Sequence, residues 1–132
     1  MSLLQRGTFQ LASGTVSEFK IDCDYLTDED WECAAFMLAR MTWPFSRVWG
    51  VPTGGNKLAE CMSKYVMPTA RPVTLLVDDV WTTGGSMNKF MREQGLNRIR
   101  GDAVKGAVLF ARGPVPEYVT ALFTIHDEWK GK

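Results

Sequence analysis

An apolar run that ends in two neighbouring acids constrains this chain more than any other feature. Residues 73–80 read VTLLVDDV, a stretch of strand length in which the acids are Asp78 and Asp79. A continuous run of this kind is typical of a strand that is buried on both faces, as in a parallel sheet. Ligands of such sheets bind outside the carboxyl ends of the strands, and we expect both acids to lie at that end.

The two acids need a partner. Their carboxylates would repel each other by roughly 3 kcal/mol at about 5 Å in an effective dielectric near 20. Side chains alternate along a strand, so both acids can face one ligand only where the strand frays. Hydroxyl donors, a divalent cation or a basic neighbour would offset the repulsion, and a sugar diol with Mg²⁺ would supply two of these.

The residues that follow Trp81 suit the opposite charge. Hydroxyl groups and open backbone N–H groups gather there at the start of a predicted helix, on Thr82, Thr83, Gly84, Gly85 and Ser86. A helix N-terminus binds anions, and glycine lets the backbone approach phosphate oxygens closely. One continuous segment therefore predicts a diol-binding end and a phosphate-binding end, and a ribose 5-phosphate unit carries both groups.

The rest of the chain alternates predicted helices and strands. A helix is expected after Thr27, a capping residue that three acids follow, and it must end before Pro44. Apolar spacing predicts further helices over residues 58–65 and from Met87 to a closing Gly95. Strands are expected at residues 47–51, 73–80, 106–112 and 119–126, after a β-hairpin or extended arm at residues 7–22.

This order of elements predicts an α/β fold with one domain over residues 1–132. The central sheet should be mostly parallel and flanked by helices, with a small N-terminal β or extended segment beside it. The connection at residues 113–118 is too short for a crossover helix, which leaves a single helical turn or an antiparallel edge strand as alternatives.

The composition excludes some partners. Fifteen Lys and Arg residues balance fifteen Asp and Glu residues, which argues against non-specific binding to nucleic acid or to a membrane surface. No stretch could span a bilayer and the first ten residues lack a signal-peptide core, so we expect a cytoplasmic protein. Cys23, Cys33 and Cys61 have no CxxC spacing and no nearby histidine, and we expect reduced thiols rather than disulfides or a zinc site.

The stretch LLVDDVWTTGGSM, residues 75–87, resembles the signature with which type I phosphoribosyltransferases bind 5-phosphoribosyl 1-diphosphate, or PRPP. In that family the acids contact the ribose hydroxyls, and the resemblance implies this catalytic role for Asp78 and Asp79, with Mg²⁺ nearby. It implies that the 5-phosphate is held by Thr82, Thr83, Gly84, Gly85 and Ser86. Trp81 replaces an aliphatic residue, and it could pack beneath the turn or stack on a base.

Two further stretches resemble the orotate branch of this family. FQLASGTVSEFKID, residues 9–22, resembles its N-terminal hood over the base, through Phe9, Leu11, Ser13, Gly14 and Ser17. GVPTGGNKLAE, residues 50–60, resembles its pyrophosphate loop and implies that the diphosphate contacts the backbone of Thr53, Gly54 and Gly55. A simple turn is the alternative for the two glycines.

A third stretch, VLFARG at residues 108–113, resembles the strand end where orotate enzymes carry an arginine that reads the base. The resemblance implies that Arg112 binds the base, with Lys20 as a second candidate, whereas a solvated surface arginine is the alternative. Thr82 also agrees with the orotate type, because enzymes for 6-oxopurines usually have an aspartate there.

The chain also departs from the orotate pattern. That family has a long mobile loop whose basic residues close over the leaving diphosphate, whereas here only MPTARP, residues 67–72, precedes the signature strand. Arg71 is its basic residue, and Ala12 and Ala111 stand where the family often has Lys and Asp. The missing cations could come from Lys57, from Lys20 or from a partner subunit, since such enzymes are commonly homodimers that share sites.

Two functions are consistent with these observations. The first is an orotate-like phosphoribosyltransferase that moves 5-phosphoribose from PRPP to a nitrogenous base, releases diphosphate and uses Mg²⁺. The second is a non-catalytic module of the same fold that binds PRPP or a nucleotide and regulates a partner. The missing loop and Ala12 favour the module, whereas Arg112 and the N-terminal segment favour the enzyme.

Overall fold

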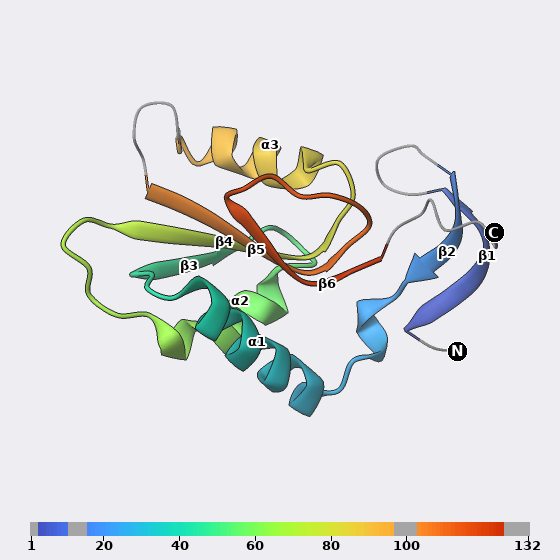
Figure 1. Ribbon diagram of the computed structural model, residues 1–132, viewed down its shortest axis with the longest axis horizontal. Coiled ribbons are helices and arrows are strands. Elements are labelled where there is room, and N and C mark those ends of the chain that lie inside the picture. Colours follow the sequence, from blue (N-terminus) through green and yellow to red (C-terminus); the bar gives the residue numbers. More distant parts are fainter. Residues whose placement is uncertain (1–2, 11–15, 97–102, 126–132) are drawn as a thin grey trace.

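The computed structural model describes residues 3–10, 16–96 and 103–125. The N-terminal part is an antiparallel hairpin of β1 (Leu4–Gln10) and β2 (Val16–Ile21), which lies beyond the carboxyl ends of the main strands (Figure 1). The predicted hairpin is therefore confirmed, and Phe9 is opposite Ser17 in its register. Leu11, Ala12, Ser13 and Gly14 lie outside the described residues.

The main sheet has four strands in the order β3-β4-β5-β6, and every neighbouring pair is parallel. The strands are β3 (Arg47–Gly50), β4 (Val73–Trp81), β5 (Ala103–Ala111) and β6 (Val119–Thr124). The apolar run at residues 73–80 forms most of β4, between two parallel neighbours, as its composition predicts. The α/β class with a parallel central sheet is thus confirmed.

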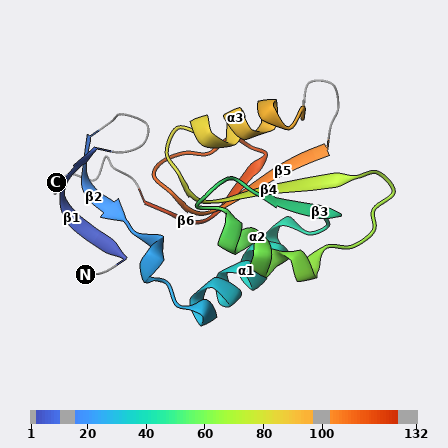
Figure 2. The ribbon, with the colours of Figure 1, turned by 180° about the vertical axis from the view of Figure 1, so that it is seen from behind.

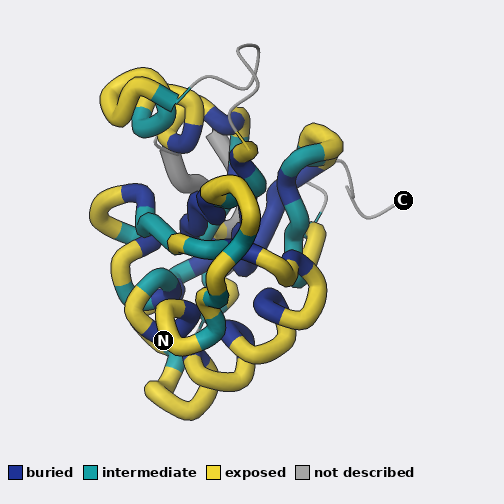
Figure 3. Tube along the Cα trace, turned by 90° about the vertical axis from the view of Figure 1, so that its left-hand side faces the viewer, coloured by how far each residue is buried: buried dark blue, intermediate teal, exposed yellow. Residues whose placement is uncertain are grey.

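Helices cover both faces of this sheet, as Figure 1 and, from behind, Figure 2 show. One face carries α1 (Asp28–Thr42), α2 (Asn56–Met62) and the short helix η2 (Ser63–Tyr65), and the other carries α3 (Gly85–Glu93). Because side chains alternate along β4, Leu75 and Val77 join the core under α1 and α2, whereas Leu76 joins the core under α3. Buried stretches run through the middle of the molecule and exposed ones lie around it (Figure 3).

Both ends of α1 are fixed by side chains. Thr27 and Asp30 form the predicted cap reciprocally: the Asp30 N–H donates to Thr27 Oγ1 at 3.1 Å, and the Thr27 N–H donates to Asp30 Oδ2 at 2.9 Å. At the other end, Lys105 of β5 donates from Nζ to the carbonyl oxygens of Thr42 at 2.8 Å and of Pro44 at 3.0 Å. A cation at this end also suits the negative pole of the helix.

The two helical crossovers of the sheet have opposite hands. The chain steps from β3 to β4 and from β4 to β5 in one direction across the sheet, yet α2 and α3 lie on opposite faces. Since a parallel crossover is right-handed in about 98% of cases, one of the two departs from the rule. In this strand order, β3 lies at an edge of the described sheet.

The last strand differs from both alternatives that the short connection suggested. β6 runs parallel to β5, with Val119 opposite Gly106 and Thr124 opposite Ala111, and residues 113–118 form no helix. Seven residues between the two strands, 112 to 118, can span about 23 Å when extended, so they can return to the start of β5 without a helix. Residue 126, which the sequence added to this strand, lies outside the described residues.

Candidate functional site

The paired acids lie inside β4 rather than at a frayed end. The strand continues to Trp81, and Val80 and Trp81 remain in register with Phe110 and Ala111 of β5. Strand alternation therefore still separates the two acids. The side chain of Asp78 lines a cavity next to α3, and the carboxylate of Asp79 lies against Gly54, where an added Cβ would be 2.5 Å from Asp79 Oδ1.

The two carboxyl groups nevertheless interact. The pKa of Asp78 is raised to about 8, first because its side chain is buried, then because it hydrogen-bonds the Asp79 carboxyl group and feels its charge. Only 8% of Asp78 is exposed, and its Oδ1 accepts the backbone N–H of Asp79 at 2.8 Å. The repulsion expected from the sequence is thus present, and burial contributes more than the charge of Asp79 to the raised pKa of Asp78.

The cavity beside Asp78 has a volume of about 220 Å³ and is built around the turn at residues 82–86. Its lining is Asp78, Val80, Trp81, Thr82, Thr83, Gly84, Gly85, Ser86, Met87 and Lys89. The structure thus brings all five predicted phosphate-binding residues together around one space. Lys89 was missed by the sequence reasoning, although its position three residues after Ser86 on the predicted helix was the signal that could have found it.

The first turn of α3 leaves donors open toward this cavity. Gly84 precedes the helix with φ at 84°, and no side chain caps the helix. Among the described residues, the one side-chain acceptor recorded here is Thr83 Oγ1, which receives the Gly85 N–H at a long 3.4 Å. An uncapped helix N-terminus with hydroxyls beside it can bind an anion.

Trp81 packs beneath this turn, which is the first of its two expected arrangements. It is 7% exposed, and a Cβ added to Gly84 would lie 2.5 Å from its Cζ2 atom. The indole therefore occupies the space that any larger residue at position 84 would need. Glycine is required there twice, for the positive φ and for the close approach of the ring.

The loop between β3 and α2 is held against β4, because the Val51 N–H donates to the Val77 carbonyl at 2.9 Å. The Gly55 N–H donates to the Val51 carbonyl at 2.8 Å, and an added Cβ at Gly55 would lie 2.7 Å from the Val51 nitrogen. Of the three backbone groups predicted to meet diphosphate, the Gly55 N–H is therefore already engaged. Thr53 and Gly54 remain as donors, and the peptide bond between Pro52 and Thr53 is cis.

The other predicted contacts have different surroundings. Arg112 is only 7% exposed at the end of β5, and its N–H donates to the Trp81 carbonyl at 2.9 Å, so the surface alternative is wrong. Lys20 is exposed on β2. Cys23, which follows β2, is buried, and burial followed by the charge of Asp79 raises its pKa to about 12. No sequence signal placed this thiol beside the acids.

The expected basic substitutes for the missing loop lie elsewhere. Arg71 precedes Val73, at the amino end of β4, and six residues of strand put it roughly 20 Å from Asp79. Lys57 pairs with Asp28 of α1 at 3.1 Å. Within one described chain, Arg71 is therefore too far away to close over a diphosphate at Gly54, and Lys57 is engaged in an ion pair.

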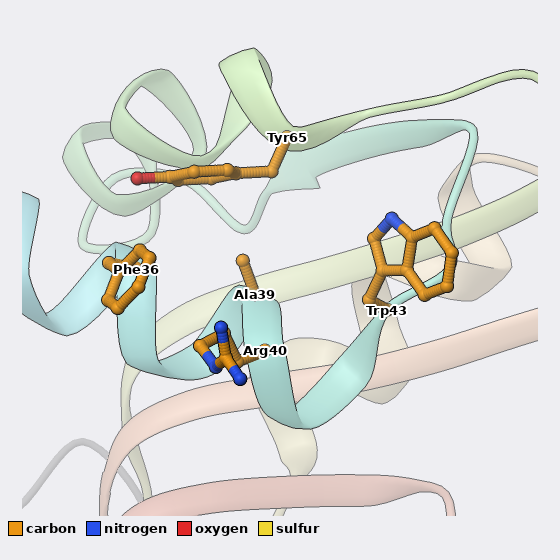
Figure 4. A pocket seen from close by; sticks show the side chains of 5 residues that line it. All are labelled: Phe36, Ala39, Arg40, Trp43 and Tyr65. Atoms are coloured by element: carbon orange, nitrogen blue, oxygen red, sulfur yellow. The ribbon is translucent and has the colours of Figure 1, made fainter.

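A second cavity, of about 330 Å³, lies between α1 and η2 (Figure 4). Its lining is Phe36, Ala39, Arg40, Trp43 and Tyr65. It is larger than the cavity at residues 82–86, but it is lined by rings and a single cation and has no acids, hydroxyl-rich turn or glycine loop. The smaller cavity is lined by an acid, hydroxyl groups and a glycine turn, and it is therefore the candidate site.

Three further properties concern metal binding, the cysteines and membrane-spanning helices. Among the described residues, no group of three or more His, Cys, Asp or Glu side chains is arranged to hold a metal ion. The cysteines are unpaired thiols, with Cys23 and Cys61 buried as expected and Cys33 exposed. Within the same part of the chain, none of the helices has the length and apolarity needed to cross a membrane.

No family profile and no curated protein sequence matches the chain. Solved structures of similar fold do match it. The orotate phosphoribosyltransferase of Aeropyrum pernix has a TM-score of 0.70 and 24% identity, over 92% of this chain and 88% of that one. The Mycobacterium tuberculosis orotate enzyme in complex with PRPP has a TM-score of 0.64 and 18% identity, over 89% and 86%. A purine phosphoribosyltransferase from Pyrococcus horikoshii has a TM-score of 0.53 and 21% identity, over 74% and 89%. The chain therefore has the fold of the type I phosphoribosyltransferases and is similar above all to their orotate members.

Proposed function

We propose that this chain is an orotate-like phosphoribosyltransferase that transfers 5-phosphoribose from PRPP to a nitrogenous base, releases diphosphate and uses Mg²⁺. The observation that carries the proposal is a contact between distant segments. Asp79 lies against Gly54 of the loop, while its neighbour Asp78 lines the cavity at residues 82–86. The acids for a ribose thus stand between a phosphate cradle and a glycine loop, which is the order of groups along PRPP.

The chain's own residues have distinct roles in this proposal. The turn at residues 82–86 holds the 5-phosphate through N–H and hydroxyl donors, and Thr53 and Gly54 offer N–H groups to the diphosphate. Asp78 and Asp79 hold the ribose hydroxyls, and the Asp79 carboxylate stabilises positive charge on the ribose as diphosphate leaves. Losing one such well-placed group typically costs ~3–4 kcal/mol, or about 10²–10³ in rate.

Two residues are proposed to bind the base. Arg112 stands at the end of β5, beside the carbonyl of Trp81, and Lys20 stands on the hairpin beyond the strand ends. Both are donors, which suits a base that presents oxygen atoms. Diphosphate release measured with a panel of bases would identify the base.

The acids fit a magnesium ion only in a particular way. The described residues form no metal cage of their own, but Mg²⁺ is usually held by one or two carboxylates together with substrate phosphates. Asp79, whose carboxylate lies against Gly54, suits that mode, with Asp78 as its neighbour on β4. The ion would neutralise charge on the departing diphosphate.

A non-catalytic PRPP- or nucleotide-binding module is the second candidate. The positions of Arg71 and Lys57 favour it, because one lies at the far end of β4 and the other pairs with Asp28. In the enzyme proposal, a homodimer partner would have to supply the cations that these two residues do not.

The experiment that tests the proposal is release of diphosphate from PRPP with Mg²⁺, across a panel of bases that includes orotate. Asp79→Asn is the inactive variant, and Asp28→Asn, which removes the same charge from the exposed start of α1, is its matched control. Base-dependent release that only Asp79→Asn reduces, by about 10²–10³, supports the enzyme. PRPP binding by calorimetry without release would sink it and leave the module.

A further inference from the structure

Lys89 shares the candidate cavity with the phosphate turn. It lies three residues after Ser86 and four after Gly85 on α3, so it stands on the helix face above the open first turn. Its side chain is exposed, and neither of the two ion pairs among the described residues includes it. The ammonium group is therefore available to a ligand in the cavity.

A phosphate group in this cavity would need more positive charge than the turn supplies. The turn itself supplies only neutral donors, and the helix end supplies about half an elementary positive charge. A phosphomonoester carries about −1.5 to −2 at pH 7. The carboxyl group in the lining, on Asp78, is buried and adds no positive charge. Together with the Lys89 ammonium group, the positive charge at the cavity approaches the charge of the anion in magnitude.

The helix dipole does not explain a lysine at this position. Lys89 is the fifth residue of α3, and the effect of the dipole on a charged side chain falls off within the first turn. A solvated lysine with no role is the competing explanation, since most lysines are exposed. The two explanations differ in what removal of the charge does to ligand binding.

We propose that Lys89 is the specificity-determining residue of this cavity and selects a sugar phosphate dianion over the uncharged sugar. The inference deepens the proposed function and rests on it for the sugar, but it concerns binding alone. The ammonium group adds a charge-assisted hydrogen bond to a cradle that otherwise holds phosphate through neutral N–H and hydroxyl donors.

The test is calorimetric titration with ribose 5-phosphate and with ribose, on the unaltered chain and on Lys89→Gln, Lys89→Arg and Arg92→Gln. Arg92 is the matched control, because it lies on the same helix, is exposed and does not line the cavity. We expect Lys89→Gln to weaken ribose 5-phosphate binding by about 10-fold or more. Lys89→Arg should retain most of the affinity, Arg92→Gln should change it by less than about 2-fold, and ribose should bind all four equally weakly.

Each outcome decides the matter. Equal losses in Lys89→Gln and Arg92→Gln would mean a general field effect and would overturn the inference, as would an unchanged affinity in Lys89→Gln. An unaltered chain that does not bind ribose 5-phosphate would overturn it too. Failure of the proposed function looks different: the affinities follow the expected order, yet PRPP releases no diphosphate with any base.

Discussion

The helices α1 and α3 begin in opposite ways. At the start of α1, Thr27 and Asp30 satisfy each other's backbone N–H groups, and three acids occupy the first turn. At the start of α3, the cap is Gly84, no side chain accepts from the backbone as a cap, and the first turn has no acid. Both helices pack on the same sheet, so packing alone does not require the difference.

The difference separates a structural helix end from one that is open to a ligand. The free N–H groups and the positive pole of a helix must be satisfied by side chains, by water or by a ligand. The α1 end is closed by its own residues and is stable without a ligand. The α3 end forgoes that stabilisation and keeps its donors beside a cavity, as an anion site requires.

The largest effect on this comparison is expected from a substitution at the residue that precedes α3, Gly84. Gly84→Ala adds a Cβ that would lie 2.5 Å from Trp81 Cζ2, at a φ of 84°. We expect a loss of about 2–4 kcal/mol in the free energy of unfolding, from backbone strain and from overpacking. Denaturant titration measures it.

Gly95→Ala is the matched control for that substitution. Gly95 also has a positive φ, 71°, but an added Cβ meets nothing within 4 Å. It should therefore lose only the conformational part, about 1 kcal/mol. Equal losses at both positions would show that the Trp81 contact contributes nothing.

The pH dependence of stability sharpens the comparison at the acids. The folded-state pKa of Asp78, about 8, exceeds its ordinary value of 3.8, so the folded chain holds the proton between these values and the unfolded chain does not. The contribution of Asp78 to the free energy of unfolding should thus be greatest below about pH 4. It should fall by about 1.4 kcal/mol per pH unit as the pH rises from there toward 8. Unfolding of the unaltered chain and of Asp78→Asn across pH 5–7 measures the difference, and parallel curves would contradict the prediction.

Removal of the α1 cap should have a smaller effect on stability and none on ligand binding. Thr27→Ala should cost about 1 kcal/mol of stability and leave ribose 5-phosphate binding unchanged, because this cap lies on α1 and serves only the helix. Ser86→Ala should do the reverse, with little loss of stability and weaker binding. A Thr27→Ala variant that loses affinity would end the distinction between the two helix ends.

The smallest expected effect concerns Lys57. Its ion pair with Asp28 is exposed, and pairs of this kind contribute little. Lys57→Gln should leave the melting temperature and the affinity for PRPP unchanged. A large rise in the KM for PRPP would instead place Lys57 at the diphosphate, as one of the cations that replace the missing loop.

Much of the fold was predictable because its signals are local. The apolar run of β4, the Thr27 cap and the helical spacing after Met87 each depend on residues within a few positions of one another, and each prediction is confirmed. The direction of β6 was not predictable in the same way. A seven-residue connection is compatible with several geometries, and packing on the sheet selects one.

The sequence by itself determined the turn at residues 82–86 and the acids before it, because strand alternation and the start of the next helix fix neighbouring residues relative to one another. Only the tertiary structure decided what meets them. Asp79 and Gly54 come together because β3 and β4 are parallel neighbours. The charge of Asp79 reaches Cys23, in the segment that follows the hairpin, and Arg71 is kept away by the length of β4. Such contacts depend on the order and direction of strands, which residues far apart in the chain set jointly and no short pattern records.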